Sequence, residues 1–343
     1  MKKTSSTLLI LAVALIIVGI AFCGFAQLRG EKPLELFSKG NGFSWGLSFG
    51  EDQKNYTVCA DGKEAFSTAE VLALDLSWVS GSVSVEPYDG KEIQIEESCS
   101  KSLNEEQRMR WQLKGGTLSV LYCANKVHSV PDKKLTVRVP RSWTAKDLTV
   151  DTTSAAVTLR DLTVEGETSI DTASGSVLLA RLELGGTLDI DTMSGEVTVE
   201  NCSCENLEID TASGDVRLTG TELRGALDID TMNGMVEAKD CVCDSVDVDT
   251  ASGSVSLLGL PAGCEVSADT MSGKVTLAFS GRPGSIDADT ASGDVTLRIP
   301  RGTKLALDFE SSSGKLKGNY YASDDGVPVK VDTASGNLTI EED

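Results

Sequence analysis

Hydrophobic and polar residues alternate from residue 151 to the C-terminus, and this alternation recurs in cycles of 19 to 22 residues. Residues 188–192 (Leu-Asp-Ile-Asp-Thr) and 197–199 (Val-Thr-Val) show the two-residue period of a half-buried strand, and helical spacing is absent. Cycles begin at Asp151, Asp171, Asp191, Asp210, Asp230, Asp249, Asp269, Asp289, Glu310 and Asp332. A unit this short cannot bury its own apolar face, so the repeat predicts a solenoid.

Each cycle contains two short strands, and the predicted fold is therefore all-β: a single-stranded parallel β-solenoid of about 20 residues per coil. The first strand ends at Asp-Thr, and the second begins after Ser-Gly, where we expect glycine to adopt the positive φ of a corner. Equivalent strands of successive coils should pair in parallel, about 4.8 Å apart. Leu188, Ile190, Val197 and Val199 are the expected core residues of one coil.

The same alternation predicts which side chains face outward. Asp189, Asp191 and Met193 should point to solvent, and Thr192 and Ser194 should point inward near the corner. Outward residues of successive coils stack, so the first residues of the cycles form one acidic column. A second column, two residues upstream, contains Asp189, Glu208, Asp228, Asp247, Asp287 and Asp308.

Two interpretations of the acidic columns stay open. They are either a strip for divalent cations or a solvated face that keeps sheets from joining edge to edge. The glycine-rich nonapeptides of calcium-binding rolls are missing, which favours the solvated face, so we predict neither a metal nor a cofactor. The candidate ligands of the alternative are Asp189, Asp191, Asp210, Asp228, Asp230 and Asp249.

The residue after each Asp-Thr pair alternates between alanine and methionine over seven coils. The series is Ala173, Met193, Ala212, Met232, Ala251, Met271 and Ala291. The three methionines would form a row of flexible apolar side chains about 9.6 Å apart, a candidate surface for a partner or for self-association. Duplication of a two-coil unit is the alternative explanation.

An apolar segment at residues 8–26 follows Lys2 and Lys3, and no charge occurs before Arg29. It is long enough to span a membrane with its N-terminus in the cytoplasm. The alternative is a cleaved signal peptide, for which Gly24-Phe25-Ala26 is an acceptable site. Either way the remaining chain would lie outside the cytoplasm, anchored to the cell membrane in the first case.

The expected organisation has four parts: an anchor or signal segment at 1–27, an irregular linker at 28–70, an N-terminal β cap at 71–140 and the solenoid repeats at 141–343. The cap should contain a hairpin in which residues 109–113 and 118–122 flank Gly115-Gly116. A cap is needed because the first coil would otherwise expose an edge.

Residues 71–140 combine a Ser-Gly corner at 80–81, the strand Asp-Gly-Lys-Glu-Ile-Gln-Ile at 89–95 and the exit Leu-Thr-Val-Arg-Val-Pro at 135–140. Followed by many Ser-Gly-x-Val cycles, they resemble the bacterial putative-adhesin domain family, a domain of unknown function in cell-envelope proteins. The resemblance covers roughly residues 70 to 343. It implies a β-solenoid outside the cell and a role in adhesion, and it brings no established ligand and no catalytic residues. This chain departs from the family in its regular Asp-Thr pairs and in the alanine–methionine alternation.

Charge and residue usage narrow the function. A formal net charge of −21 argues against nucleic acid and bare anionic membrane as partners, but cations, basic proteins and cationic peptides remain. His128 is the single histidine, and the Asp and Ser residues recur in every coil as structural positions do, so we do not predict an enzyme. The predicted function is a membrane-anchored, surface-exposed binding or scaffolding module. The alternatives are an envelope-stress or signalling protein that senses cations or cationic peptides, and a simple spacer.

The chain has nine cysteines, and export would permit disulfides. We expect Cys99 and Cys123 to pair from neighbouring strands of the cap. The pairs Cys202/Cys204 and Cys241/Cys243 should lie two coils apart, about 9.6 Å, which is too far for one zinc site. Cys264 lies one coil beyond Cys243, so a disulfide and two half-buried thiols are both open.

Overall fold

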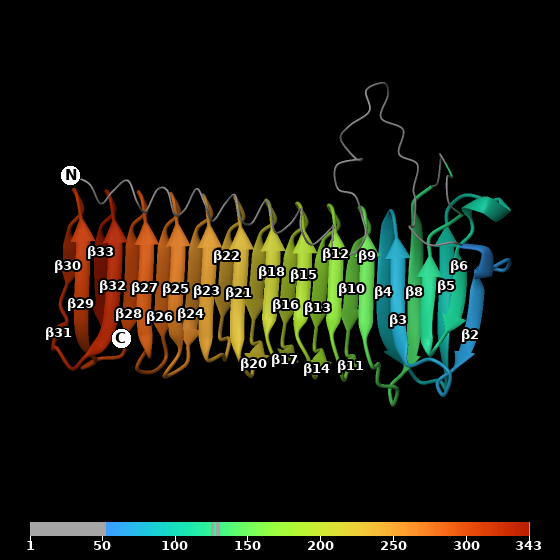
Figure 1. Cartoon of the computed structure of the whole chain (residues 1–343), viewed down its shortest axis with the longest axis horizontal. Coiled ribbons are helices and arrows are strands. Elements are labelled where there is room, and N and C mark those ends of the chain that lie inside the picture. The colour runs from blue at the N-terminus through green and yellow to red at the C-terminus, as the bar shows by residue number, and fades with distance from the viewer. Residues whose placement is uncertain (1–52, 125–126, 128–130, 343) are drawn as a thin grey trace, which may run out of the picture. The chain divides into compact units, whose positions relative to one another are not determined.

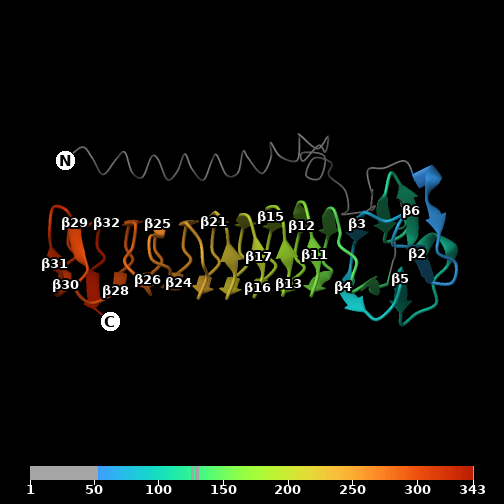
Figure 2. The ribbon, with the colours of Figure 1, turned by 90° about the horizontal axis from the view of Figure 1, so that it is seen from below.

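The computed structural model describes residues 53–124, 127 and 131–342, and Asn55–Ala124 with Ser129–Asp343 form one compact unit. This unit is an all-β parallel solenoid of about ten coils, with about 20 residues in each, as predicted. The helices of the described part are two short 3₁₀ turns, η1 (Gln53–Asn55) and η2 (Glu105–Gln107). Figures 1 and 2 show the coils stacked one beside the next.

Two long sheets form the opposite walls of the stack, one with 15 strands (sheet 1) and one with 14 (sheet 2). In the repeats, sheet 1 contains β9 (Leu148–Thr152), β12 (Thr168–Thr172), β15 (Leu188–Thr192), β18 (Leu207–Thr211), β21 (Ala226–Thr231), β23 (Ser245–Thr250), β25 (Glu265–Thr270) and β27 (Ser285–Thr290). Sheet 2 contains β10 (Ala156–Arg160), β13 (Val177–Ala180), β16 (Val197–Glu200), β19 (Val216–Thr219), β22 (Val236–Lys239), β24 (Val255–Leu260), β26 (Val275–Phe279) and β28 (Val295–Ile299).

Four coils carry a third short strand, which the sequence analysis did not predict. These strands form a separate sheet (sheet 3), made of β11 (Thr163–Val164), β14 (Glu183–Leu184), β17 (Ser203–Cys204) and β20 (Glu222–Leu223). Their alternation covers only two residues, too short to distinguish from a turn in the sequence.

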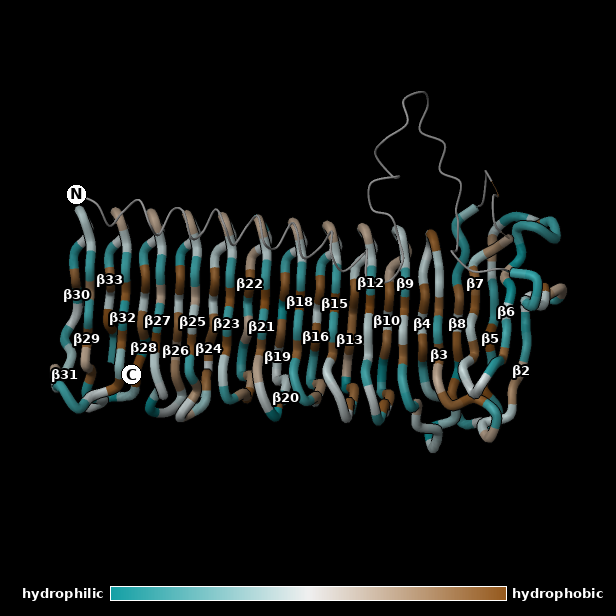
Figure 3. The backbone as a smooth tube through the Cα atoms, in the orientation of Figure 1, coloured by the Kyte–Doolittle hydropathy of each residue, from teal (hydrophilic) through white to brown (hydrophobic). Residues whose placement is uncertain are grey.

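Successive coils pair residue for residue, so each position of the repeat forms a column. Ile190 pairs with Ile170 on one side and Ile209 on the other. Leu188, Ile190, Val197 and Val199 are fully buried, as predicted. Brown and teal segments alternate along the strands in Figure 3, which is the pattern of a wall with one apolar and one polar side. Ser194 was expected to point inward but is exposed, because the chain turns the corner after Thr192 and the strand alternation ends there.

The corner between sheet 1 and sheet 2 has the same structure in most repeats; Ala155 replaces the glycine in the first repeat, and Ser311 replaces the threonine in the outermost coil. The buried hydroxyl of Thr192 accepts a hydrogen bond from the backbone N–H of Gly195, three residues later, at 2.9 Å, and the equivalent bond of Thr231 and Gly234 is 3.0 Å. The corner glycines do not have positive φ, so our expectation for them was wrong. A Cβ on Gly195 would lie 1.9 Å from the carbonyl oxygen of Gly175 in the neighbouring coil. Glycine is required by this close stacking and not by its φ.

The N-terminal cap is built around a first coil that continues the repeats. This coil is β3 (Ala73–Trp78) and β4 (Gly81–Tyr88), which pair in parallel with β9 and β10. Beyond it lie β7 (Thr117–Leu121) and β8 (Lys133–Pro140), followed by the antiparallel strands β6 (Arg110–Lys114) and β5 (Glu92–Cys99) and then β1 (Thr57–Val58) and β2 (Lys63–Ser67). The hairpin at Gly115-Gly116 is confirmed. Strands β1 and β2 lie within the range assigned to the linker, so the fold begins earlier than residue 71.

A buried ion pair lies inside the cap. The ammonium group of Lys133 donates to Glu97 Oε1 at 2.5 Å, to the carbonyl oxygen of Gln107 at 2.8 Å and to that of Tyr122. It also lies 4.9 Å and 4.0 Å from the ring centroids of Trp78 and Tyr122. Burial lowers the pKa of Lys133, and the charge of Glu97 opposes that effect. Because both side chains are almost completely buried, removing either one would leave an uncompensated charge.

The last two coils do not follow the order of the sequence. The chain forms β29 (Lys304–Ser311), β30 (Leu316–Gly318) and β31 (Tyr321–Ala322), and then returns through β32 (Val327–Thr333) and β33 (Leu338–Glu342). Strand β32 lies between β27 and β29, and β33 lies between β28 and β30. The C-terminal coil is therefore inserted into the stack, and the coil containing Glu310 is the outermost one (Figure 1).

The eight cysteines among the described residues are not part of disulfides. Cys99 ends a strand of sheet 2 and Cys123 follows a strand of sheet 1, so the premise that they lie on neighbouring strands was wrong. Glu222 pairs with Ser203 and with Val242, which places the two Cys-x-Cys pairs two coils apart, as expected. The nearby thiol of Cys264, together with burial, raises the pKa of Cys243.

The predicted membrane segment at residues 8–26 lies outside the described residues. Within the part of the chain that the structure describes, no helix has the length and apolar character needed to cross a bilayer.

We predict that Gly195→Ala destabilises the solenoid by about 1 to 3 kcal/mol, because the added methyl group would push successive coils apart. Ser194→Ala at the adjacent exposed position is the matched control and should change stability by less than about 0.5 kcal/mol. Urea denaturation of both variants measures the difference. Equal stability of the two variants would contradict the stacking role of the corner glycines.

Candidate functional site

The outer wall of sheet 1 carries the two predicted columns of carboxylates, and we call this surface the acidic face. The register of the strands confirms that both columns are continuous over many coils. The corner column contains Asp151, Asp171, Asp191, Asp210, Asp230, Asp249, Asp269, Asp289, Asp332 and Glu310. The inner column contains Asp189, Glu208, Asp228, Asp247, Ser267, Asp287, Lys330 and Asp308.

Many aspartates of the acidic face have raised pKa values. Burial, together with the charges of neighbouring aspartates, raises the pKa of Asp191, Asp230 and Asp269 to about 7. The same causes raise the pKa of Asp228 to about 6, and the pKa values of Asp210, Asp249 and Asp289 are raised as well. Carboxylates one strand apart repel by about 0.9 kcal/mol even in water, and partial burial strengthens that repulsion. The face therefore accepts protons, or other cations, more readily than isolated carboxylates do.

One lysine of the chain lies among these carboxylates. The ammonium group of Lys330 is 3.2 Å from Asp287 Oδ1, 3.4 Å from Asp289 Oδ1 and 3.3 Å from Asp332 Oδ2. Partial burial acts against the charge of Lys330, but the hydrogen bond to Asp287 and the charges of the neighbouring aspartates raise its pKa. The spacing of the two columns thus allows one ammonium group to contact three carboxylates on two coils.

The inserted strand β32 explains why this lysine lies there. Lys330 pairs with Asp287 on one side and with Asp308 on the other. If the coils followed the sequence order, Asp308 would stack directly against Asp287. The insertion therefore separates Asp287 from Asp308 and places an ion pair with Asp287 where two carboxylates would otherwise be neighbours.

The candidate metal ligands Asp189, Asp191, Asp210, Asp228, Asp230 and Asp249 all belong to the acidic face. Over the described residues, no group of three or more His, Cys, Asp or Glu side chains is arranged to hold a metal ion. The aspartates of one coil lie two residues apart along a strand, about 6.6 Å, and this spacing is wide for one small cation.

The methionine row borders the acidic face at the corner. Met193 and Met232 are 51% and 45% exposed, as their predicted outward orientation requires, and Met271 is half-buried. The row therefore presents two exposed apolar side chains on alternate coils and a third that is partly covered. Its role as a binding surface stays a prediction.

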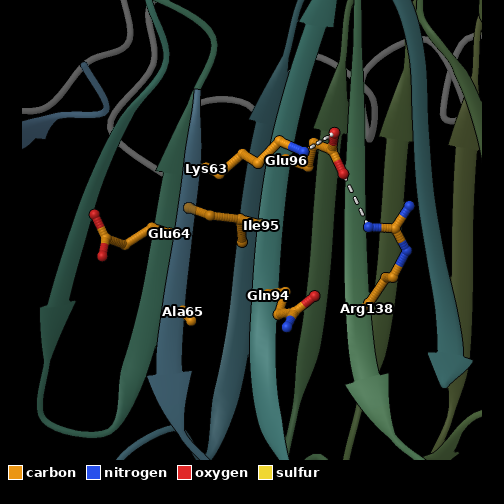
Figure 4. A pocket seen from close by; sticks show the side chains of 7 residues that line it. All are labelled: Lys63, Glu64, Ala65, Gln94, Ile95, Glu96 and Arg138. Atoms are coloured by element: carbon orange, nitrogen blue, oxygen red, sulfur yellow. Dashed lines mark hydrogen bonds and ion pairs between the residues drawn. The ribbon is translucent and has the colours of Figure 1, made fainter. Parts of the chain in front are cut away.

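A shallow pocket of about 360 Å³ lies on the outer side of the cap, over β2, β5 and β8 (Figure 4). Its charged groups neutralise one another, because Glu96 accepts from Lys63 at 2.7 Å and from Arg138 at 2.9 Å. These contacts lower the pKa of Glu96. Both cations of the pocket are thus paired with the same carboxylate.

Sequence reasoning missed Lys330 and the buried Lys133–Glu97 pair. Lys330 stands two residues before Asp332, at a position that is usually acidic, and this break in the repeat was the available indication. The partners Glu97 and Lys133 are 36 residues apart in an irregular region, and no local pattern links them.

Comparison with solved structures gives distant similarities. A putative lipid binding protein from Parabacteroides distasonis ATCC 8503 is 15% identical, with 81% of this chain and 97% of that chain covered, at a TM-score of 0.42. A putative adhesin from Bacteroides fragilis NCTC 9343 is 11% identical, with 81% and 95% covered, at 0.34. A putative cell adhesion protein from Clostridium sporogenes ATCC 15579 is 11% identical, with 82% and 99% covered, at 0.19.

No curated protein matches the chain by sequence. The model of one family, Toastrack DUF4097, matches residues 71–229 and 225–341. The match begins at the first coil of the cap and extends through the inserted C-terminal coil, and it confirms the resemblance inferred from the sequence. The chain therefore belongs to the Toastrack DUF4097 family.

Proposed function

We propose that this protein is a non-catalytic binding module, anchored in the cell membrane by residues 8–26 and exposed outside the cytoplasm, whose acidic face binds cationic segments of other proteins or peptides. The observation that carries the proposal is the contact of Lys330 with three carboxylates of the acidic face. This contact is an intramolecular example of the proposed recognition.

The spacing of the acidic face suits an extended cationic peptide. Its two columns lie about 6.6 Å apart, which is also the distance between alternate side chains of an extended strand. A peptide lying parallel to the strands of sheet 1, with Lys or Arg at every second position, would place one cation over each column. Neighbouring coils repeat the same pair of carboxylates, so a longer or multivalent ligand would find several equivalent sites.

The polar residues of the repeat support a binding role over catalysis. The recurring threonines accept hydrogen bonds from the corner glycines, and the recurring aspartates form the acidic face. A catalytic site requires a particular nucleophile, acid or base that is set apart from its surroundings, whereas these side chains occupy equivalent positions in successive coils.

Anchoring is tested on intact cells that produce the full chain. A membrane-impermeant amine reagent should label the lysines of the solenoid without cell lysis, and the labelled protein should sediment with membranes. Labelling that occurs only after lysis would contradict the proposed location. Labelled protein in the medium would instead support cleavage after residue 26.

We predict that a peptide of alternating lysine and serine binds the purified full chain and that neutralising the centre of the acidic face lowers the number of peptides bound. The variant Asp228→Asn, Asp230→Asn, Asp247→Asn, Asp249→Asn removes the carboxylate pairs of two coils, so it should bind fewer peptides per chain, while the intact pairs on other coils keep their affinity. Isothermal titration calorimetry at low salt measures the change, and added salt should weaken binding to the unmodified chain.

The matched control removes the same number of charges elsewhere. Glu165→Gln, Glu183→Gln, Glu205→Gln, Glu222→Gln changes exposed residues in and next to sheet 3 and leaves the acidic face intact. This variant should bind as many peptides per chain as the unmodified chain. An equal loss in both variants would show a dependence on net charge alone and would refute a site on the acidic face.

We predict that the solenoid is more stable at pH 5 than at pH 8. Asp191, Asp230 and Asp269 have a folded-state pKa of about 7 against an ordinary value of 3.8, so the folded state binds protons more tightly than the unfolded state. Their favourable contribution is complete below about pH 4 and is lost as the pH rises through 7. The melting temperature should therefore fall by about 5 °C from pH 5 to pH 8.

The variant Asp191→Asn, Asp230→Asn, Asp269→Asn provides the control, because it cannot titrate at these positions. It should melt at nearly the same temperature at pH 5 and pH 8, and above the unmodified chain at pH 8. A melting temperature of the unmodified chain that rises from pH 5 to pH 8 would contradict the assignment. Peptide binding should have the opposite dependence, since protonation at pH 5 removes the carboxylates that bind cations.

A further inference from the structure

The stack of coils has an open edge at the coil formed by β29 and β30. Strand β30 is the last strand of sheet 2, and β31 covers only Lys304 and Leu305 at the corresponding edge of sheet 1. In the described part of the chain, no strand lies beyond residues 306–311 of β29. Their outer backbone groups are therefore available for pairing with another strand.

Apolar side chains are incompletely covered at this edge. Leu307 and Phe309 continue the core columns of Val329 and Val331, but they are only half-buried, whereas those valines are buried. Leu316 continues the column of Leu338 and is 39% exposed. The core thus ends at a surface that lacks one further layer.

Charged side chains of both signs point outward along the same edge. Asp308 and Glu310 stand on β29, beside Lys330 and Asp332 of the acidic face. Lys315, just before β30, and Lys317, on β30, flank the inward Leu316. All four are exposed and form no ion pair with another described residue. Residues 301–318 contain four basic and two acidic side chains, although the chain has a net charge of −21. This edge thus lacks the excess of negative charge that the chain as a whole has, and it offers both signs of charge to a second copy.

We propose that two copies of this chain join tail to tail through this edge, about a two-fold axis parallel to the strands. Such an axis places β29 of each copy beside β30 of the other. Sheet 1 and sheet 2 of one coil run in opposite directions, so the two new strand pairs are antiparallel. Glu310 then faces the partner's Lys315, Asp308 faces the partner's Lys317, and Phe309 packs against the partner's Leu316. The interface is isologous, so every contact occurs twice.

The charges select this arrangement over the other two-fold pairing. An axis perpendicular to the sheets would place β29 against the β29 of the second copy. In that pairing the core residues must stay inside and the second copy must not overlap β31. Asp308 then faces either Asp308 or Glu310 of the second copy. Like charges directly opposite one another destabilise a strand pair, whereas the first arrangement contains four opposite-charge pairs.

Sedimentation velocity on the purified full chain in detergent tests the proposal. The unmodified chain should sediment as a dimer, with twice the protein mass of the monomer. Variant P (Asp308→Lys, Glu310→Lys) and variant N (Lys315→Glu, Lys317→Glu) should each be monomeric, since all four edge charges then have one sign. An equimolar mixture of P and N should form a heterodimer, because each β29 again meets an oppositely charged β30.

The four positions are exposed, so both variants should fold, and the melting temperature checks this. Variant N should melt like an unmodified monomer, and variant P slightly lower, because Asp308→Lys places a second lysine opposite Lys330. A monomeric unmodified chain at about 100 μM would overturn the proposal and leave the edge to another partner. Dimers that persist in P and N would overturn it as well, since they would form elsewhere, for example through the methionine row. So would a mixture of P and N that remains monomeric.

Discussion

The close stacking of backbone at the corner glycines determines the geometry of the whole solenoid. A Cβ on any of these glycines would lie 1.7 to 1.9 Å from a carbonyl oxygen of the adjacent coil, so no other residue fits without separating the coils. The threonine three residues earlier satisfies the glycine N–H inside this crowded corner. The corner always spans the same number of residues, so the repeat length changes, between 19 and 22 residues, only in the loops on the opposite side. Strand register, and with it every column of side chains, follows from this constraint.

Because strands of successive coils pair residue for residue, an Asp before each corner threonine necessarily produces the acidic face. Two features of the molecule reduce the resulting repulsion between carboxylates. Alternate aspartates of the corner column have pKa values near 7, so protons occupy part of the column at neutral pH. Near the end of the stack, where β32 is inserted, an ammonium group takes the place of a carboxylate. Both solutions supply positive charge to the face, and the proposed ligands would supply it in the same way.

The sequence predicted what repeats, and it failed where the repeat is broken. Two-residue alternation identified Ile190 as core and Met193 as surface, because successive side chains of a strand point to opposite sides of the sheet. It did not identify the insertion of β32, since Glu310 and Asp332 fit the period equally well in either spatial order. The corner glycines were expected to have positive φ, and this was wrong. A close contact between two coils cannot be recognised from the sequence of a single coil. The buried pair of Glu97 and Lys133 depends on tertiary contacts in the cap.

The two ends of the solenoid differ in a way that bears on its function. The cap closes the first end with antiparallel strands and a buried ion pair, whereas the last coil leaves strand edges, apolar side chains and balanced charges at the surface. In the proposed dimer the two-fold axis parallel to the strands continues sheet 1 of one copy with sheet 2 of the other. The two acidic faces then point in opposite directions. Such a dimer cannot place both acidic faces on one flat ligand, so binding to a flat ligand would gain no avidity. It would instead link two cationic partners that lie on opposite sides. Dimerisation would thus turn a binding module into a scaffold.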